Sequence, residues 1–297
     1  MRIFVEATGS LVSNGLIGPI KESGHVCVAS DASPESVGRF LADEFFQVPL
    51  AASPSYIPTV MDLLEARRID LVLPTLDDAL LKWADARDEL TRRGIVLALS
   101  DRKTLAVCRD KWQTYCFFQS HGIPTPKTSL RQEYPLLKPR DGRGGSGIRL
   151  TEEPADMTGM ISQEFLEGEE YSIDVFCGLD HRPVYIVPRK RLAVREGKST
   201  AGLVVDKPEM EALVRRICAA LPFTGAVNMQ CFETREGIFF TEINPRIGGG
   251  TVLAMRATEN WIPLTVEIFA NRREVKPSRN VKYGLKMARY YAEVYYR

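Results

Sequence analysis

The 297-residue chain lacks the features that mark several large classes of protein. Its 39 Lys and Arg residues nearly balance 38 Asp and Glu residues, so bulk charge does not favour nucleic acid or an anionic membrane as a partner. No apolar run reaches the ~18 residues that a membrane-spanning helix needs. The apolar stretch at the N-terminus is too short for a signal peptide. We therefore expect a cytoplasmic protein with no nucleic-acid or membrane partner.

Metal-cluster and disulfide signatures are also missing. The six cysteines form no CxxC pair, and the three histidines are scattered without metal-ligand spacing. The cysteines are expected to be reduced and mostly buried, as is usual inside cells. A zinc site is not predicted.

The first third of the chain alternates between strand and helix patterns. Residues 69–75, "IDLVLPT", form a continuous apolar run typical of a parallel strand that is buried on both faces. Apolar residues at three- and four-residue steps predict helices over 55–68 and 77–94, the second closed by Gly94. This rhythm predicts a small parallel sheet with helices on both faces.

The pattern changes near residue 100, where we place a domain boundary. Residues 101–122, "DRKTLAVCRDKWQTYCFFQSHG", predict one helix that ends at Gly122. Most of the following segments have β character. Residues 225–245 predict a hairpin, because turn chemistry around "TREG" separates two strand-like runs.

A glycine loop, "GRGGSG", spans residues 142–147. It matches GxGxxG, but a strand-like run follows it, whereas a dinucleotide fingerprint opens a helix. A glycine loop between strands can offer backbone N–H groups to phosphates, and Lys138 on the leading strand could reach a phosphate as a point charge. A surface hairpin with an ordinary exposed lysine is the alternative.

The segment "TEINPRIGGG" carries the second polar motif. Residues two apart on a strand share a face, so Glu242 and Asn244 project together. Gln230 would lie beside Glu242 if the two strands pair, which would assemble three oxygen donors of the kind that Mg²⁺ accepts. Arg246 is placed to hold an anion. The alternative is a solvated strand end followed by a turn.

Together these motifs, with "IDLVLPTLDDAL" and "DKWQTY", resemble the ATP-grasp superfamily and its carbamoyl-phosphate-synthase-like branch. The resemblance covers most of the chain. It implies an α/β fold of three parts: a parallel α/β domain over residues 1–100, a linker helix and small β-rich lid over 101–165, and a larger antiparallel lobe over 166–297. ATP would lie between the lid and the lobe.

The resemblance also implies residue roles. ATP would be bound by Lys111 and Lys138 at its phosphates, by a flap that includes Gly144, Gly145, Ser146 and Gly147, by the backbone of Glu164 and Leu166 at adenine, and by Glu170 at ribose. Gln230, Glu242 and Asn244 would hold Mg²⁺, with Mn²⁺ as an alternative. Arg246 would bind the phosphoryl group or an acyl-phosphate intermediate.

A further basic segment, "VPRKRLAVREGKS", places Arg189 and Arg191 on one face of a strand. We expect one or both to hold the substrate carboxylate or the intermediate, with Arg191 as a catalytic residue. A basic, solvated edge strand is the alternative.

The function implied by the resemblance is an ADP-forming ligase that joins a small-molecule carboxylate to an amine or similar nucleophile through an acyl phosphate. Two alternatives stay open at this point: a phosphotransferase that stops after phosphate transfer, and a nucleotide-binding regulatory subunit. A homodimer is expected from similar proteins. The identity of the substrates, and whether the acceptor is small or macromolecular, cannot be read from the sequence.

Overall fold

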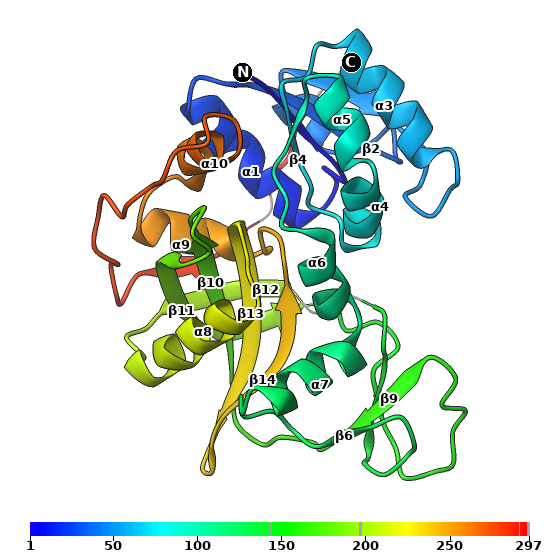
Figure 1. Ribbon diagram of the computed structural model, residues 1–297, viewed down its shortest axis with the longest axis vertical. Coiled ribbons are helices and arrows are strands. Elements are labelled where there is room, and N and C mark those ends of the chain that lie inside the picture. Colours follow the sequence, from blue (N-terminus) through cyan, green and yellow to red (C-terminus); the bar gives the residue numbers. More distant parts are fainter. Residues whose placement is uncertain (143, 196–197, 291, 296–297) are drawn as a thin grey trace.

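The computed structural model describes residues 1–142, 144–195, 198–290 and 292–295, without the side chains of 11–14, 195 and 198. The chain forms three sheets (Figure 1). The first is parallel, as predicted, and has five strands in the order β3-β2-β1-β4-β5. Its strands are β1 (Arg2–Val5), β2 (Val26–Asp31), β3 (Glu44–Gln47), β4 (Leu71–Leu73) and β5 (Val96–Leu97).

Helices cover both faces of this parallel sheet. The helical elements are α1 (Leu11–Glu22), α2 (Gly38–Leu41), α3 (Tyr56–Ala66), the 3₁₀ turn η1 (Asp77–Ala79), α4 (Leu80–Asp85) and α5 (Arg87–Arg92). Because side chains alternate along a strand, Phe4 packs into one core with α3, α4 and α5, whereas Ile3 and Val5 pack into another core with α1. That second core also includes residues from the C-terminal lobe, so the two parts are joined by shared apolar packing.

The single helix predicted over residues 77–94 is wrong. The segment forms η1, α4 and α5, and a turn at Ala86 separates α4 from α5. The Arg87 side chain donates hydrogen bonds to the carbonyl oxygens of Leu99 and Ser100, at 2.7 and 2.9 Å, which anchors α5 to the end of the sheet. Tertiary contacts here override the local periodicity.

The helix predicted over residues 101–122 is also divided, into α6 (Arg102–Arg109) and α7 (Lys111–Ser120). Asp110 between them has extended backbone (φ −100°, ψ 114°), and its carboxylate caps α7 by accepting from the Trp112 N–H at 2.8 Å. The same carboxylate forms an ion pair with Arg140, which comes from the next domain segment. The break therefore ties α7 to the small sheet that follows.

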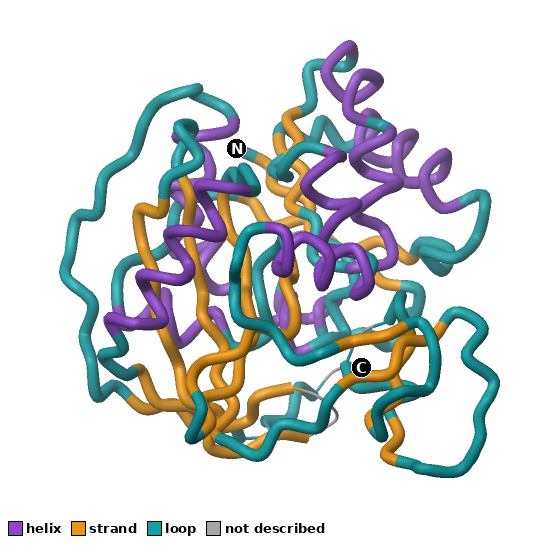
Figure 2. Tube along the Cα trace, turned by 60° about the horizontal axis from the view of Figure 1, so that its bottom comes forward, coloured by secondary structure: helices purple, strands orange, loops and turns teal. Residues whose placement is uncertain are grey.

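That small sheet has four antiparallel strands in the order β6-β9-β7-β8 and projects from the body at the lower right of Figures 1 and 2. Its strands are β6 (Thr128–Ser129), β7 (Leu136–Pro139), β8 (Arg149–Leu150) and β9 (Met160–Gln163). The glycine loop joins β7 to β8, as expected; Arg143 within that loop lies outside the described residues.

The third sheet is six-stranded and antiparallel, in the order β14-β13-β10-β11-β12-β15. Its strands are β10 (Glu169–Cys177), β11 (Pro183–Arg195), β12 (Lys198–Val204), β13 (Gly225–Thr234), β14 (Gly237–Asn244) and β15 (Lys286–Ala288). The predicted hairpin of β13 and β14 is confirmed, and Gln230 lies directly opposite Glu242. The accompanying helices are α8 (Pro208–Ala220), α9 (Thr251–Ala257) and α10 (Trp261–Phe269).

The two faces of this large sheet differ in polarity. Ile173, Val175 and Met229 face a core that also contains α7 and α8. The other face carries polar side chains along most of its length, and its far end, at Phe176 and Val187, is covered by α9 and α10. Alternation along the strands therefore leaves one polar surface beside the parallel domain.

Across the described parts of the chain, no helix combines the length and the apolar character needed to cross a membrane.

Candidate active site

A cleft of about 610 Å³ lies over the polar face of the large sheet. The parallel domain contributes Asp31 and Asp77, the glycine loop contributes Gly144 and Gly145, and the sheet contributes most of the floor. Asp31 ends β2, and Asp77 follows β4, so both lie at the carboxyl ends of parallel strands. That edge is where open α/β sheets place ligand sites.

Three oxygen-donor side chains meet on the floor of the cleft. Gln230 and Glu242 are cross-strand partners, and Asn244 lies two residues further along β14, opposite Asn228. Cross-strand partners have Cβ atoms about 5 Å apart, which is within reach of one shared cation. The described residues contain no cluster of three or more His, Cys, Asp or Glu that could hold a metal. One carboxylate with two amides fits Mg²⁺, which keeps several waters and binds substrate phosphates.

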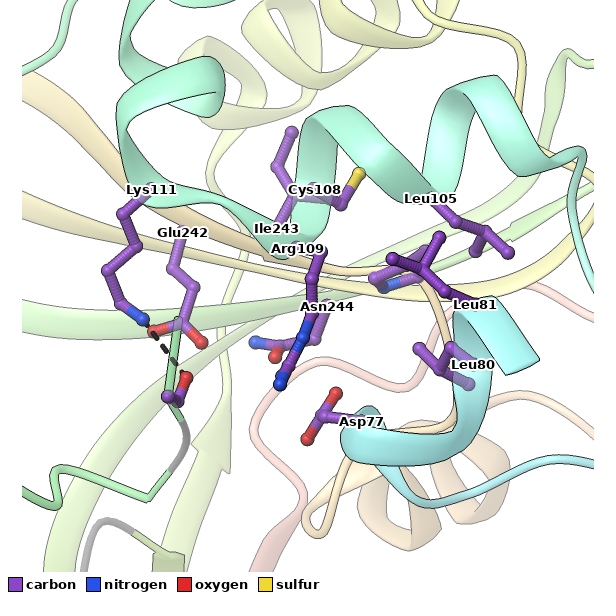
Figure 3. Close-up of a pocket in the computed structure, with 12 residues that line it drawn as sticks. Asp77, Leu80, Leu81, Leu105, Cys108, Arg109, Lys111, Glu242, Ile243 and Asn244 are labelled. Atoms are coloured by element: carbon purple, nitrogen blue, oxygen red, sulfur yellow. Dashed lines mark hydrogen bonds between the residues drawn. The ribbon is translucent and has the colours of Figure 1, made fainter. Parts of the chain in front are cut away.

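Two lysines lie beside this donor set. Lys138, on β7, is only 7% exposed. Burial lowers the pKa of Lys138 to about 8; neighbouring Lys111 adds to the shift, while Glu242 and Glu170 oppose it. Lys111, at the start of α7, donates from Nζ to the carbonyl oxygen of Gly142 at 3.0 Å (Figure 3). Lys111 thus contacts the first residue of the glycine loop, and Lys138 lies on the strand that leads into it.

A small pocket of about 20 Å³ adjoins the cleft and brings several of these groups together (Figure 3). It is lined by Asp77 from the parallel domain, Arg109 and Lys111 from α6 and α7, and Glu242 and Asn244 from β14. On the side of the pocket that α6 forms, Arg109 also makes ion pairs with Asp78 of the parallel domain and with Asp141 of the segment before the glycine loop. The site is therefore built by all three parts of the chain.

Arg246 is held by a carboxylate of the parallel domain. Its Nε and Nη2 donate to the two oxygens of Asp77, at 2.8 and 2.6 Å, and its Nη1 donates to the Ile247 carbonyl at 3.1 Å. Both side chains of the pair are largely buried. Burial acts to lower the pKa of Arg246, but Asp77 outweighs it, so the pKa is raised and the guanidinium stays charged.

A buried glutamate supports the segment that carries Asp77. Glu6 accepts hydrogen bonds from the backbone N–H groups of Thr75 and Leu76, both at 3.1 Å, and from the Trp83 ring N–H at 3.0 Å. The Tyr56 hydroxyl donates to the same carboxylate. Burial raises the pKa of Glu6, and these four hydrogen bonds oppose the shift. Glu6 therefore fixes the backbone that presents Asp77 to Arg246.

Replacing Asp77 by alanine should lower the free energy of unfolding by about 3–5 kcal/mol, because it leaves the Arg246 cation buried without its partner. Urea denaturation would measure the change. The matched control is Asp85→Ala, which breaks an exposed ion pair with Arg102 in the same domain and should cost less than about 1 kcal/mol. Equal losses of unfolding free energy in the two variants would show that the buried pair with Arg246 stabilises the fold no more than an exposed ion pair does.

Arg191 and Glu170, predicted to serve the substrate and the ribose, form an ion pair with each other. Both line the cleft, on adjacent strands β11 and β10. A ligand that engages either side chain there meets a neutral pair rather than a free charge.

The structure brings most predicted site residues to one place, but not all of them. Gly144, Gly145, Glu170, Arg191, Gln230, Glu242, Asn244 and Arg246 line the cleft, and Lys111 lines the adjoining pocket. Of the described residues predicted for the site, Lys138, Ser146, Gly147, Glu164 and Leu166 line neither cavity. The Glu164 N–H is already bonded to the Lys127 carbonyl at 2.9 Å, which leaves its carbonyl oxygen as the group that could meet an adenine amino group.

Sequence reasoning missed three residues that the parallel domain contributes to the cleft. Thr75 and Asp77 lie in the cleft wall, and Asp31 lines it from β2. A signal for the two acids existed, because Asp31 ends one buried parallel strand and Asp77 lies four residues after the end of another. Ser172, on β10 between Gln230 and Arg189, carried no such signal.

A parallel α/β domain, a small sheet that carries a glycine loop and a larger antiparallel lobe surround one cleft, which is the arrangement of an ATP-grasp protein. Residues 108–250 match the ATP-grasp domain family, and residues 14–98 match the PylC-like N-terminal domain family. The chain belongs to the ATP-grasp superfamily.

Known proteins agree with this assignment. The 3-methyl-D-ornithine–L-lysine ligase of Methanosarcina barkeri is 25% identical over 240 residues, which cover 78% of this chain and 63% of that protein. The chain thus spans less than two thirds of the length of this curated relative. Among solved structures, biotin carboxylase from Campylobacter jejuni superposes with a TM-score of 0.76 at 16% identity, covering 96% of this chain and 74% of that one. An L-amino acid ligase from Bacillus licheniformis gives 0.71 at 15%, covering 93% and 75%. At these identities the two structures establish the fold.

Proposed function

We propose that the chain is an ADP-forming ligase that activates a substrate carboxylate as an acyl phosphate for attack by an amine. One observation carries the proposal: Gln230, Glu242 and Asn244 line the same cleft as the glycine loop, with Lys111 and Lys138 beside them. Oxygen donors and cations around a cavity suit a metal-bound polyphosphate. The name of the Methanosarcina barkeri relative suggests amino acids as the substrates.

In this proposal, the substrate carboxylate oxygen attacks the γ-phosphorus of ATP, the bond to the bridging oxygen breaks, and ADP leaves. An amine nitrogen then attacks the acyl carbon, phosphate leaves with the C–O bond electrons, and the nitrogen loses a proton. Mg²⁺, when bound, would neutralise phosphate charge, and Gln230, Glu242 and Asn244 would hold it. Mn²⁺ could occupy the same oxygen donors.

This chain's own residues would position and shield the reacting groups. Lys138 and Lys111 would contact the phosphates, and the glycine loop would lie over them and exclude water. Arg246, held by Asp77, would face the transferred phosphoryl group, and Arg191 would serve the carboxylate. The backbone of Glu164 and Leu166 would contact adenine, Glu170 the ribose, and Ser146 and Gly147 would complete the flap. A homodimer and a cytoplasmic location remain predictions.

The test is ADP release with ATP and Mg²⁺ against pooled amino acids and carboxylic acids, with mass detection of products. A ligase gives a new mass equal to two pool members minus water, and the mass disappears when ATP is omitted. A phosphorylated pool member would instead indicate simple phosphotransfer. ATP binding without turnover in every pool would contradict the proposal and favour a regulatory role.

A further inference from the structure

The start of the glycine loop is attached to the junction between α6 and α7. The Lys111 N–H donates to the carbonyl oxygen of Arg140 at 2.9 Å, and its Nζ donates to that of Gly142 at 3.0 Å. The Asp110 carboxylate, between the two helices, pairs with the Arg140 side chain. These contacts hold the segment that leads into the loop against one point of the linker between the domains.

Arg109, the last residue of α6, makes a contact of a different kind at this junction. Its Nη2 lies 2.6 Å from a carboxylate oxygen of Asp141, in the segment before the loop, and donates to Oδ1 of Asp78 at 3.1 Å. Asp78 belongs to the η1 turn of the parallel domain. One guanidinium group therefore joins the start of the glycine loop to the parallel domain.

The Arg109 cation lies between two carboxylates. Because both acids contact the same nitrogen, their nearest oxygens lie within about 6 Å of each other, a distance at which like charges repel. Loss of the Arg109 charge would therefore remove an attraction between loop and domain and also uncover a repulsion. Arg189, on the cleft floor, differs, because it pairs with the buried Asp174 of its own lobe.

The turn that holds Arg109 also holds the arginine expected at the transferred phosphoryl group. Asp77, beside Asp78 in η1, accepts from Nε and Nη2 of Arg246 at 2.8 and 2.6 Å. Figure 3 shows the Arg109 side chain pointing toward the same turn, beside Asp77. The buried Glu6 fixes the backbone that leads into this turn. The glycine loop and Arg246 thus take their positions from adjacent residues of one turn.

A loop held in this way would keep water from the reacting groups. An acyl phosphate is lost when a water oxygen attacks its acyl carbon. The C–O bond to phosphate breaks, phosphate leaves with the bonding electrons, the water loses a proton and the carboxylate forms again. ADP is then released without a ligated product. The ratio of ADP released to product formed therefore measures how well the loop covers the site.

We propose that Arg109 is a positioning residue, which attaches the glycine loop to the parallel domain through Asp141 and Asp78 and so keeps ATP consumption coupled to product formation. The coupling rests on the proposed function, whereas the attachment of the loop can be measured without any substrate. Because its Nη2 already contacts two carboxylates, Arg109 acts on the loop and not on the phosphates.

The first test quantifies ADP and ligated product together, for the full chain with ATP, Mg²⁺ and the pooled amino acids and carboxylic acids. In Arg109→Met the ADP-to-product ratio should rise by roughly 3- to 10-fold, the size expected for losing a partly exposed ion pair and uncovering a repulsion. Asp141→Asn removes the attachment without the repulsion and should give a smaller rise. The double variant should return to the Asp141→Asn level, because the loop then has no charge there for Asp78 to repel. Arg102→Met, which breaks an exposed ion pair with Asp85 on the same helix, is the control and should keep the wild-type ratio.

The second test is hydrogen–deuterium exchange of the same variants without ATP or substrate, which measures the attachment itself. Peptides that contain residues 140–142 should exchange faster in Arg109→Met than in the wild type, and more slowly again in the double variant. Exchange in Arg102→Met should match the wild type. The free energy of unfolding should change little in every variant, because these ion pairs are partly exposed.

An unchanged ADP-to-product ratio in Arg109→Met would overturn the inference, and so would unchanged exchange at residues 140–142. A double variant as uncoupled as Arg109→Met would place Arg109 on the phosphates and overturn it too. Failure of the proposed function gives a different pattern, in which the wild type makes no product in any pool. Exchange then decides alone: faster exchange in Arg109→Met, reversed in the double variant, retains the attachment and discards the ligase.

Discussion

Replacing Glu242 by glutamine is expected to slow ADP release by roughly 100- to 1000-fold while the protein stays folded. Glutamine keeps the size and hydrogen-bonding reach of the side chain but removes the only carboxylate from the Gln230, Glu242 and Asn244 set. A hard divalent cation would lose most of its charge-based attraction to the protein. The concentration of Mg²⁺ that gives half-maximal ADP release should rise, and steady-state assays over a Mg²⁺ series would measure it.

The control for this variant is Glu236→Gln, at the exposed tip of the same β13–β14 hairpin. It makes the same chemical change on the same pair of strands, outside the cleft, and should leave ADP release unaltered. If Glu242→Gln kept the wild-type rate and Mg²⁺ dependence, the carboxylate would not be a metal ligand. Repeating the series with Mn²⁺ would show whether the donor set also serves that ion.

Local patterns predicted the parts of the fold that depend on near neighbours. The hairpin of β13 and β14 followed from its turn chemistry, and the cross-strand partnership of Gln230 and Glu242 followed from that hairpin. The two helix breaks did not follow from local sequence. Asp110 ends a helix because its carboxylate both caps α7 and pairs with Arg140, which is 30 residues away. Such a contact has no periodic signature in the sequence.

The site shows the same division between local and distant contacts. The donors on one hairpin could be predicted from two-residue spacing, because strand alternation is a local property. The partner of Arg246 could not, since Asp77 is 169 residues away and belongs to another domain. Glu6, which orders the segment before Asp77, accepts hydrogen bonds from backbone N–H groups that lie 69 and 70 residues further along the chain. The chemistry of the cleft was therefore more predictable than the contacts that position it.

Lys138→Met is expected to weaken ATP binding by roughly 10- to 100-fold, the loss of one charge-assisted hydrogen bond, and at the same time to stabilise the fold. The lysine is 7% exposed, and burial lowers its pKa from 10.5 to about 8. Keeping it protonated at neutral pH therefore opposes folding, by up to about 3 kcal/mol for a shift of this size. Equilibrium ATP binding and urea denaturation at pH 7 would measure the two effects. Lys103→Met, at an exposed position of α6, is the control and should change neither by much.

The pH dependence separates this explanation from a simple gain in apolar packing. Between pH 8 and 10.5 the unfolded chain binds more protons at this lysine than the folded chain, so wild-type stability at this site rises with pH. The advantage of Lys138→Met should therefore be full below pH 8 and should vanish above about pH 10.5. In the wild type, ATP affinity should fall as pH rises through about 8. The Lys138 amine is then neutral, and it must take up a proton when the phosphates bind. A variant that is equally stabilised at pH 7 and pH 10.5 would show that packing, and not a buried cation kept for the nucleotide, explains the gain.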